Sequence, residues 1–246
     1  MNRFRIFCTN ISNPSLARAK KQFKILKEAK YDVLVLTETK DSSGCNYLID
    51  EFNSSNYYTI FDKPSGNEYG VLIVSKHKIT KSFFYSEGNY LHPRVQGVNV
   101  LFGSISCELI GVYVPSNDRK KILRKKRFID ELVGNLNAKK VSNRILCGDF
   151  NSLEPNHFPK YGMFRKWEYD FYNKILFSGL IDAYRKLYPN KNEYSWVGRT
   201  GNGYRYDHFF ISKNIEFNLV DTFYCNNLKK NNLTDHLSMV LEMEVR

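Results

Sequence analysis

The chain has 246 residues and a mass of 28.9 kDa, and no Pro/Gly/Ser-rich linker or internal repeat divides it, so we expect one domain over residues 1–246. Its 37 Lys and Arg residues exceed its 25 Asp and Glu residues, and the resulting net charge of +12 favours a polyanionic partner such as nucleic acid. The five cysteines form no Cys-x-x-Cys pair and no apolar run reaches transmembrane length, which argues against a disulfide framework, a zinc site and a membrane span.

The first half of the chain alternates predicted strands and helices before it becomes strand-rich. A strand is predicted over residues 3–9, and Asn13-Pro14 then supplies a cap and first-turn pair for a helix with apolar residues at helical spacing. A buried strand over residues 33–36 ends at Glu38, and a short helix follows over residues 46–52. Apolar residues then alternate or form short runs between Gly, Pro and Asn breaks, which predicts a meander of antiparallel strands. Its segments are residues 57–61, 70–75, 79–85, 97–101 and 105–114.

The second half begins with a basic amphipathic helix over residues 118–136, in which the Lys and Arg residues occupy a solvated face. Two strand-rich halves with helices outside them predict an α/β fold in which two sheets form a sandwich. Strand ends gathered at one edge of such a sandwich would bring their polar residues together. The remaining predicted elements are a strand over residues 142–147, a helix over 164–178, and strands over 206–212, 219–225 and 237–245.

Polar side chains stand at the ends of five apolar runs that are spread along the chain. Gly148-Asp149-Phe150-Asn151 is the most informative, because it places a carboxylate and a carboxamide where a strand opens into a loop. Turn chemistry accounts for any one such residue taken alone. Five of them indicate a single site, and the other four are Asn10, Glu38, Asp207 and Asp235-His236.

Short motifs follow one another along the chain in a characteristic order. They are Thr9-Asn10, Thr37-Glu38-Thr39, Glu68-Tyr69-Gly70, Val112-Tyr113-Val114-Pro115-Ser116, Gly148-Asp149-Phe150-Asn151, Tyr194-Ser195-Trp196, Tyr204-Arg205-Tyr206-Asp207 and Thr234-Asp235-His236. Over nearly the whole chain, this set resembles the endonuclease/exonuclease/phosphatase superfamily, and most of all its exonuclease III and abasic-site endonuclease branch. The resemblance implies a deoxyribonuclease I-like, four-layer α/β sandwich, with two mainly antiparallel sheets packed face to face and helices outside.

The resemblance also implies a metal site. Magnesium prefers oxygen ligands and keeps several of its waters, so one carboxylate with a neighbouring amide is a suitable anchor. By resemblance, Glu38 binds the magnesium ion, Asn10 is its neighbour, and Asp235 serves the metal or the leaving group. We expect manganese to be able to replace magnesium.

The remaining chemical roles concern the phosphate and the attacking water. By resemblance, Asp149 orients and deprotonates the water, and Asn151 holds water or a phosphate oxygen in line. His236, kept cationic by Asp207, contacts the scissile phosphate, and Tyr113 donates a hydrogen bond to it. Taken singly, residues of these types are also common as caps, turn residues and packing residues.

Other residues are expected to contact the substrate. Trp196 and Tyr204 fall where abasic-site endonucleases line a pocket for a base-free sugar, although residues of these types are at least as often part of a core. Arg94 matches a basic position of several relatives approximately, and Arg205 is part of the Arg-x-Asp motif that ends at Asp207.

The sequence departs from the family pattern at two places. Exonuclease III relatives carry an acidic residue two positions after the first Asn, where this chain has Ser12, which puts one secondary metal contact in doubt. Abasic-site enzymes place Asn directly after the Tyr-x-Pro element, whereas this chain has Ser116 there and Asn117 one position later. Either residue can supply the phosphate contact.

From these observations we expect a monomeric magnesium-dependent phosphodiesterase that hydrolyses DNA. Without a secretory signal or a membrane span, we expect it to be cytoplasmic, with nucleic acid rather than a membrane as its partner. Three alternatives remain open at this stage. They are a nuclease of loose DNA or RNA specificity, a phosphatase for a small phosphorylated molecule or lipid, and a catalytically silent nucleic-acid-binding domain.

Overall fold

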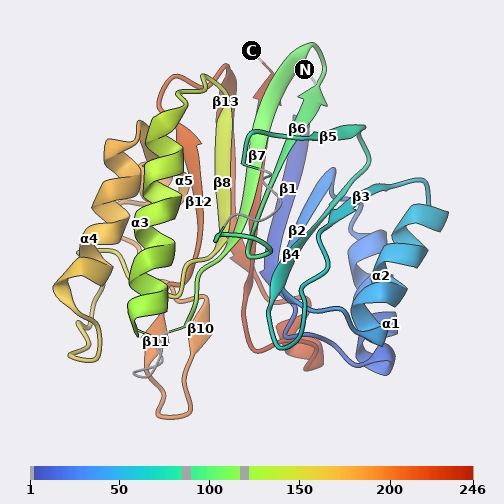
Figure 1. Cartoon of the computed structure of the whole chain (residues 1–246), viewed down its shortest axis with the longest axis horizontal. Helices are drawn as coiled ribbons and strands as arrows, with labels where there is room; N and C mark the ends of the chain where they lie inside the picture. The colour runs from blue at the N-terminus through green and yellow to red at the C-terminus, as the bar shows by residue number, and fades with distance from the viewer. Residues whose placement is uncertain (1–2, 85–89, 117–121, 246) are drawn as a thin grey trace.

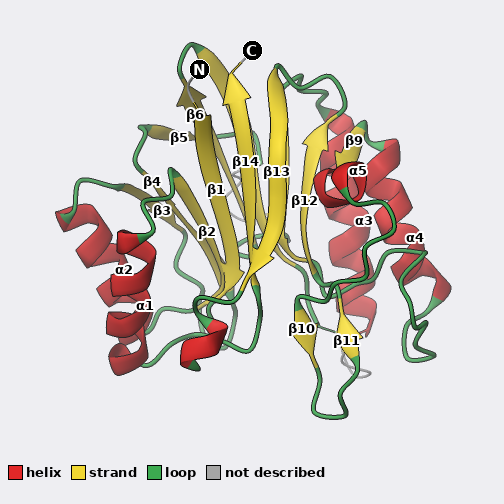
Figure 2. Ribbon diagram, turned by 180° about the vertical axis from the view of Figure 1, so that it is seen from behind, coloured by secondary structure: helices red, strands yellow, loops and turns green. Residues whose placement is uncertain are grey.

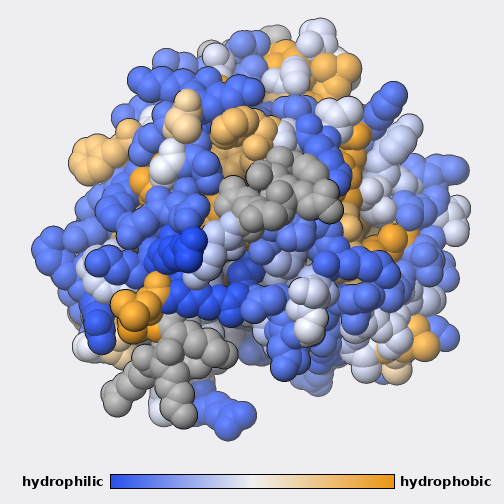
Figure 3. Space-filling view, in the orientation of Figure 1, coloured by the Kyte–Doolittle hydropathy of each residue, from blue (hydrophilic) through white to orange (hydrophobic). Residues whose placement is uncertain are grey.

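The computed structural model describes residues 3–84, 90–116 and 122–245. Within these residues, two six-stranded sheets pack face to face and helices cover their outer faces (Figure 1). This arrangement confirms the four-layer α/β sandwich that was expected. The face of the molecule seen in Figure 3 is largely hydrophilic, in agreement with the high content of charged residues.

The first sheet contains both the first and the last strand of the chain. Its strand order is β13-β14-β1-β2-β4-β3; β1 and β2 run parallel, and the other neighbouring pairs are antiparallel. The strands are β1 (Arg3–Asn10), β2 (Val33–Thr39), β3 (Tyr58–Phe61), β4 (Gly70–Ser75), β13 (Phe217–Cys225) and β14 (Ser238–Val245).

The second sheet repeats this pattern, with one parallel pair among antiparallel neighbours. Its order is β5-β6-β7-β8-β12-β9, and the parallel pair is β7 with β8. Both sheets are therefore mainly antiparallel, as predicted. The strands are β5 (Ile79–Lys81), β6 (Val95–Phe102), β7 (Ile105–Tyr113), β8 (Arg144–Asp149), β9 (Leu180–Asp182) and β12 (Asp207–Ser212).

The helices complete the outer layers. Helices α1 (Leu16–Glu28) and α2 (Ser43–Ser54) pack on the first sheet, and α3 (Ile122–Ala138) and α4 (Lys166–Phe177) pack on the second. A short hairpin of β10 (Trp196–Val197) and β11 (Gly203–Tyr204) projects from the end of the sandwich opposite the chain termini (Figure 2). The other elements are α5 (Ala183–Leu187) and the 3₁₀ turn η2 (Lys229–Asn231).

Aliphatic and aromatic side chains from the inner faces of both sheets form the central core. The sheets approach each other closely at Gly111 of β7. A Cβ atom there would lie 2.7 Å from Val35 Cγ1 and 2.7 Å from Val71 Cγ1, closer than side chains tolerate. Glycine at this position therefore lets the two parallel strand pairs pack against each other.

Several boundaries differ from the predicted ones by a few residues, and the hydrogen bonds account for two of these shifts. Helix α1 begins at Leu16 with Ser15 as its N-cap, whose Oγ accepts a hydrogen bond from Arg18 N, whereas Asn13 has a φ of 38° and lies outside the helix. The strand predicted over residues 79–85 ends at Lys81, because Ser82 Oγ accepts a hydrogen bond from Phe84 N and turns the chain. The predicted basic helix is described from Ile122, and residues 118–121 lie outside the described part of the chain.

No helix in the described ranges is both long enough and apolar enough to cross a membrane.

A buried ion pair joins the two helices that cover the second sheet. Lys125 of α3 and Glu168 of α4 have fully buried side chains, and Lys125 Nζ lies 2.6 Å from Glu168 Oε1. The same ammonium group donates to the backbone oxygen of Asn151, also at 2.6 Å. Burial lowers the pKa of Lys125, and the attraction of Glu168 opposes that effect. This pair thus holds the loop after β8 as well as the helices.

We expect Lys125→Met to lower the free energy of unfolding by about 3–5 kcal/mol, because it leaves the Glu168 carboxylate buried without its cation. Urea denaturation measures the change. Lys166→Met is the matched control, because Lys166 is exposed and pairs with Asp170 on the surface of α4, where an ion pair contributes about 0–1 kcal/mol. Equal effects of the two substitutions would contradict this interpretation.

Candidate active site

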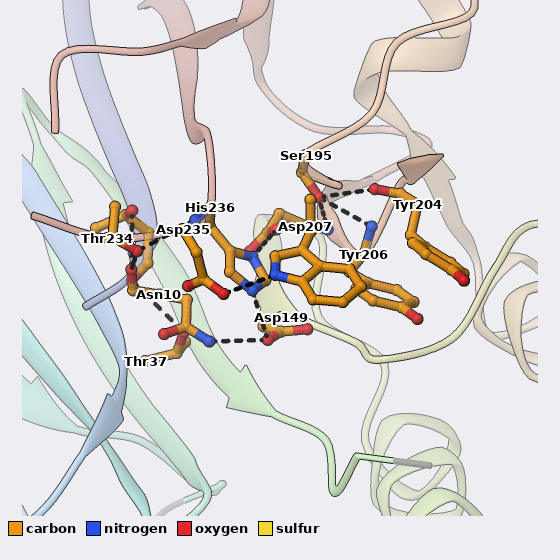
Figure 4. Close-up of polar contacts among 12 residues, drawn as sticks. Asn10, Thr37, Asp149, Ser195, Tyr204, Tyr206, Asp207, Thr234, Asp235 and His236 are labelled. Atoms are coloured by element: carbon orange, nitrogen blue, oxygen red, sulfur yellow. Dashed lines mark hydrogen bonds and ion pairs between the residues drawn. The ribbon is translucent and has the colours of Figure 1, made fainter. Parts of the chain in front are cut away.

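Strand ends from both sheets meet at one polar pocket. Asn10 ends β1, Asp149 ends β8 and Asp207 begins β12, so the centres of the two sheets each contribute (Figure 4). The pocket has a volume of about 400 Å³. Among the residues predicted from the sequence, those that line it are Asn10, Glu38, Tyr113, Ser116, Asp149, Asn151, Trp196, Tyr204, Asp235 and His236.

A bulge in β2 determines where Glu38 points. The pairing of β2 with β4 shifts by one residue between Thr37 and Thr39, and Glu38 adopts a φ of 57°. Its Oε2 atom accepts hydrogen bonds from Asn10 Nδ2 at 2.8 Å and from the Tyr113 hydroxyl at 3.2 Å. The Glu38 side chain remains partly exposed while Asn10 is buried, so its carboxylate is fixed in direction and still accessible from the pocket.

Asp149 lies where β8 opens into its loop. The preceding Gly148 has a φ of 148°, and a Cβ atom there would lie 1.8 Å from Val112 O, so only glycine fits. Asp149 Oδ1 accepts a hydrogen bond from Asn151 N at 2.9 Å, and Asp149 Oδ2 accepts one from Asn10 Nδ2 at 3.1 Å. Asn151, with a φ of 45°, donates through Nδ2 to Val114 O at 3.0 Å. The loop therefore holds the Asp149 carboxylate and the Asn151 amide in place.

Asp207 and His236 form a buried pair behind Asp149. His236 Nδ1 lies 2.8 Å from Asp207 Oδ2, and His236 Nε2 lies 3.9 Å from Asp149 Oδ2 (Figure 4). Burial alone would lower the pKa of His236, but the negative charges of Asp207 and Asp149 outweigh it and raise that pKa to about 9. His236 is therefore an imidazolium at neutral pH.

The pKa of Asp149 is raised well above that of an exposed aspartate. Burial raises this pKa, the nearby Asp207 raises it further, and His236 and Asn10 offset part of the effect, which leaves it at about 7. A carboxylate with such a pKa accepts a proton readily near neutral pH. The site thus places a proton acceptor beside a cationic imidazolium.

The donor set fits a magnesium ion at Glu38. The Glu38 carboxylate is partly exposed and the Asn10 side chain lies beside it, which leaves room for the waters that magnesium retains. Among the described residues, Asp149, Asp207 and His236 also have ligand atoms that lie within 4.8 Å of one another. Magnesium prefers oxygen ligands to an imidazole nitrogen, so the Glu38 side suits it better than this group does.

Two predicted substrate contacts lie elsewhere than expected. Arg205 is fully buried and pairs with Asp182 at 2.6 Å and Glu154 at 3.2 Å, so it does not face the pocket, and its predicted role as a substrate contact was wrong. The guanidinium of Arg94 is buried over the Tyr113 ring, 4.9 Å from the ring centroid, and therefore positions Tyr113 instead of lining the pocket. Asn117 lies outside the described residues.

Three supporting residues were not assigned roles from the sequence. Ser195 Oγ accepts hydrogen bonds from Tyr206 N at 3.0 Å and Asp207 N at 3.1 Å, and Thr234 Oγ1 donates to Asn10 O at 2.7 Å. Buried Gln22 of α1 donates through Nε2 to Ile11 O at 3.2 Å and Leu233 O at 2.9 Å, which ties together the loops after Asn10 and before His236. Of these three, only Gln22 gave a signal in the sequence, as a polar residue on the apolar face of the predicted helix.

The pocket is also lined by residues that were given no role from the sequence, namely Met163, Gly198, Arg199, Thr200 and Tyr206.

Comparisons with known proteins agree with this geometry. The chain matches the model described as the Endonuclease/Exonuclease/phosphatase family over residues 10–236. It is similar to the structure of an AP endonuclease from Archaeoglobus fulgidus, with 23% identity, a TM-score of 0.80, and coverage of 97% of this chain and 98% of that chain. No curated protein sequence matches the chain.

Two further structures are similar at lower identity. One is a 3′ phosphatase from Neisseria bound to a product DNA hairpin, with 17% identity, a TM-score of 0.80, and coverage of 97% of this chain and 98% of that chain. The other is an AP endonuclease from Leishmania major, with 18% identity, a TM-score of 0.73, and coverage of 99% and 88%. At these identities the likeness shows a common fold.

We expect Asp207→Asn to lower the pKa of His236 from about 9 towards the ordinary histidine value of about 6.5, because the amide keeps the shape but not the charge of Asp207. An NMR titration of the imidazole in metal-free protein measures the shift, with His236→Gln used to assign the signal. Tyr224→Phe is the control, since it removes a hydrogen bond to the Asp207 carbonyl and leaves the charge unchanged. A pKa that stays near 9 in Asp207→Asn would show that Asp207 does not keep His236 cationic.

Proposed function

Because the chain belongs to the endonuclease/exonuclease/phosphatase family, we propose that it is a magnesium-dependent phosphodiesterase that hydrolyses DNA. The observation that carries this proposal is the convergence of Glu38, Asp149 and the Asp207–His236 pair on one pocket. These are the groups that phosphoester hydrolysis needs, namely a metal anchor, a proton acceptor for water and a cation for the phosphate.

Each residue has a defined part in the proposed reaction. Glu38, beside Asn10, would hold the magnesium ion, which would supply positive charge to offset the charge on the phosphoryl and leaving oxygens. Asp149 takes the proton of the attacking water at its carboxylate, and its pKa of about 7 suits that role. The His236 imidazolium donates a hydrogen bond to a phosphate oxygen and balances its charge.

Tyr113 and Asn151 help to orient the groups that take part in the reaction. The Tyr113 hydroxyl, buried at the pocket wall, donates its one proton to Glu38 and so fixes the direction of that carboxylate; a hydrogen bond to a phosphate oxygen would replace this one. The Asn151 side chain is held by Val114 O and lines the pocket next to Asp149. Such fixed donors lower the cost of aligning water and phosphate for in-line attack.

DNA is the substrate that the surroundings of the site favour. The net charge of +12 attracts a polyanion, and the rings of Trp196, Tyr204 and Tyr206 form an aromatic wall on one side of the pocket. We infer a preference for abasic DNA, because a base-free sugar costs little to extrude and packs against such a wall. Similar structures include AP endonucleases and a 3′ phosphatase bound to product DNA, in agreement with this inference.

In magnesium buffer, we expect DNA with an abasic site to be cleaved faster than intact duplex DNA. A chelator should abolish cleavage of both. Binding should weaken with salt along a log-log slope of about −0.9 for each phosphate neutralised. A panel of abasic, nicked, single-stranded and RNA substrates, together with a small phosphomonoester, tests these points. Equal cleavage of abasic and intact DNA supports a nuclease of loose specificity, and rapid hydrolysis of the phosphomonoester without DNA cleavage supports a phosphatase.

We expect Asp149→Asn to lower turnover by about a hundredfold or more, because the amide cannot accept the proton of water. Glu38→Gln should raise the magnesium concentration that half-maximal activity requires, because it removes the charge of the metal anchor. Steady-state kinetics over a magnesium series measures both effects. Asp170→Asn, the same change on the exposed face of α4, is the control. Near-normal turnover in Asp149→Asn removes that residue from the proposed role.

A further inference from the structure

Both oxygens of the Asp235 carboxylate are engaged by other side chains. Asp235 Oδ1 accepts a hydrogen bond from the Ser12 hydroxyl at 3.1 Å, and Asp235 Oδ2 accepts one from Trp196 Nε1 at 2.7 Å. The second bond joins an ionised acceptor to an indole N–H, which has no other hydrogen-bonding group. The Asp235 carboxylate therefore connects the loop after β1 with the hairpin strand β10.

Backbone contacts hold Trp196 against the same segment. Leu237 N donates to Ser195 O at 2.7 Å, and Trp196 and His236 form an isolated antiparallel bridge. The indole ring packs 5.9 Å from the ring centroid of Tyr206 at an interplanar angle of 27°, and 5.3 Å from that of Tyr204. The backbone contacts fix the main chain at Trp196, and the hydrogen bond to Asp235 fixes the rotation of the indole ring beside Tyr204 and Tyr206.

Ser12 makes this arrangement possible. A second carboxylate at that position would face Asp235 with like charge, and the pair would need a cation between them. The Ser12 hydroxyl instead donates a hydrogen bond and adds no charge.

We propose that Asp235 is a positioning residue that sets the orientation of Trp196, and that it determines substrate preference through the indole instead of binding the metal. Two hydrogen bonds link Ser12, Asp235 and Trp196 in a row, and Asp235 and Trp196 line the pocket. The substrate-preference part rests on the proposed function. The positioning of the indole and the independence of metal binding do not.

Tryptophan fluorescence tests the positioning directly. The chain has two tryptophans, Trp167 and Trp196, so a Trp167→Phe background leaves Trp196 as the single reporter. In that background, Asp235→Ala should lower the anisotropy of Trp196, and Asp235→Asn should restore much of it, because the amide oxygen still accepts from the indole. Unchanged anisotropy in Asp235→Ala would overturn the proposal.

Manganese binding tests the metal question without a substrate. Titration of Mn²⁺ alone, followed by electron paramagnetic resonance of the free ion, should give the same dissociation constant for Asp235→Asn as for the unaltered protein. Glu38→Gln, the same carboxylate-to-amide change at the proposed anchor, should weaken binding. Weakening by Asp235→Asn equal to that by Glu38→Gln would make Asp235 a metal ligand and overturn the proposal.

A double-mutant cycle tests the effect on preference. Asp235→Ala and Trp196→Phe should each lower the ratio of kcat/KM for abasic over intact DNA by about threefold to tenfold, the usual effect of one lost hydrogen bond. The double variant should lower the ratio no further than either single one, because both remove the same bond. Additive losses would overturn the coupling. Absence of DNA cleavage in the unaltered protein would contradict the proposed function alone, since the fluorescence and manganese results remain decisive.

Discussion

A single buried amide connects the two halves of the site. Asn10 Nδ2 donates to Glu38 of its own sheet and to Asp149 of the facing sheet. Two carboxylates so close to one donor repel each other, and a neutral amide with two N–H groups is the smallest side chain that satisfies both. The arrangement requires the sheets to be in fixed register. Gly111 allows that close approach, and Thr234 and Gln22 hold the loops on either side.

Two groups of buried charges lie near the strand ends that form the site. The first group pairs Arg205 with Asp182 and Glu154, and the second pairs the His236 imidazolium with Asp207 and Asp149. Arg205 is fully buried in its ion pairs and does not line the pocket, whereas His236 does. Arg205 and His236 therefore differ in place: the first is part of the buried interior and the second faces the pocket.

The sequence predicted those parts of the fold that depend on local hydrophobic patterns. Apolar runs and the polar residues at their ends located most of the strands and the convergence of Asn10, Asp149 and Asp207. Two strand-rich halves predicted a two-sheet sandwich, and the resemblance to a family implied its four layers. Elements of two to five residues, such as β9, β10, β11 and α5, are too short to show a period. The direction of the Arg205 side chain depends on a long-range ion pair with Asp182, which no local pattern reveals. The same holds for Gln22, whose partners are backbone groups of Ile11 and Leu233.

The position of β1 has a consequence for how the protein is made. This strand lies between β2, which follows it closely in the chain, and β14, whose Glu244 pairs with Arg3. Until β14 has been synthesised, one edge of β1 keeps its backbone groups unpaired, whereas every strand of the second sheet precedes β13. The segment that closes this edge follows directly after His236. A growing chain on the ribosome therefore acquires the His236 imidazole and the strand that pairs with the open edge of β1 at nearly the same time.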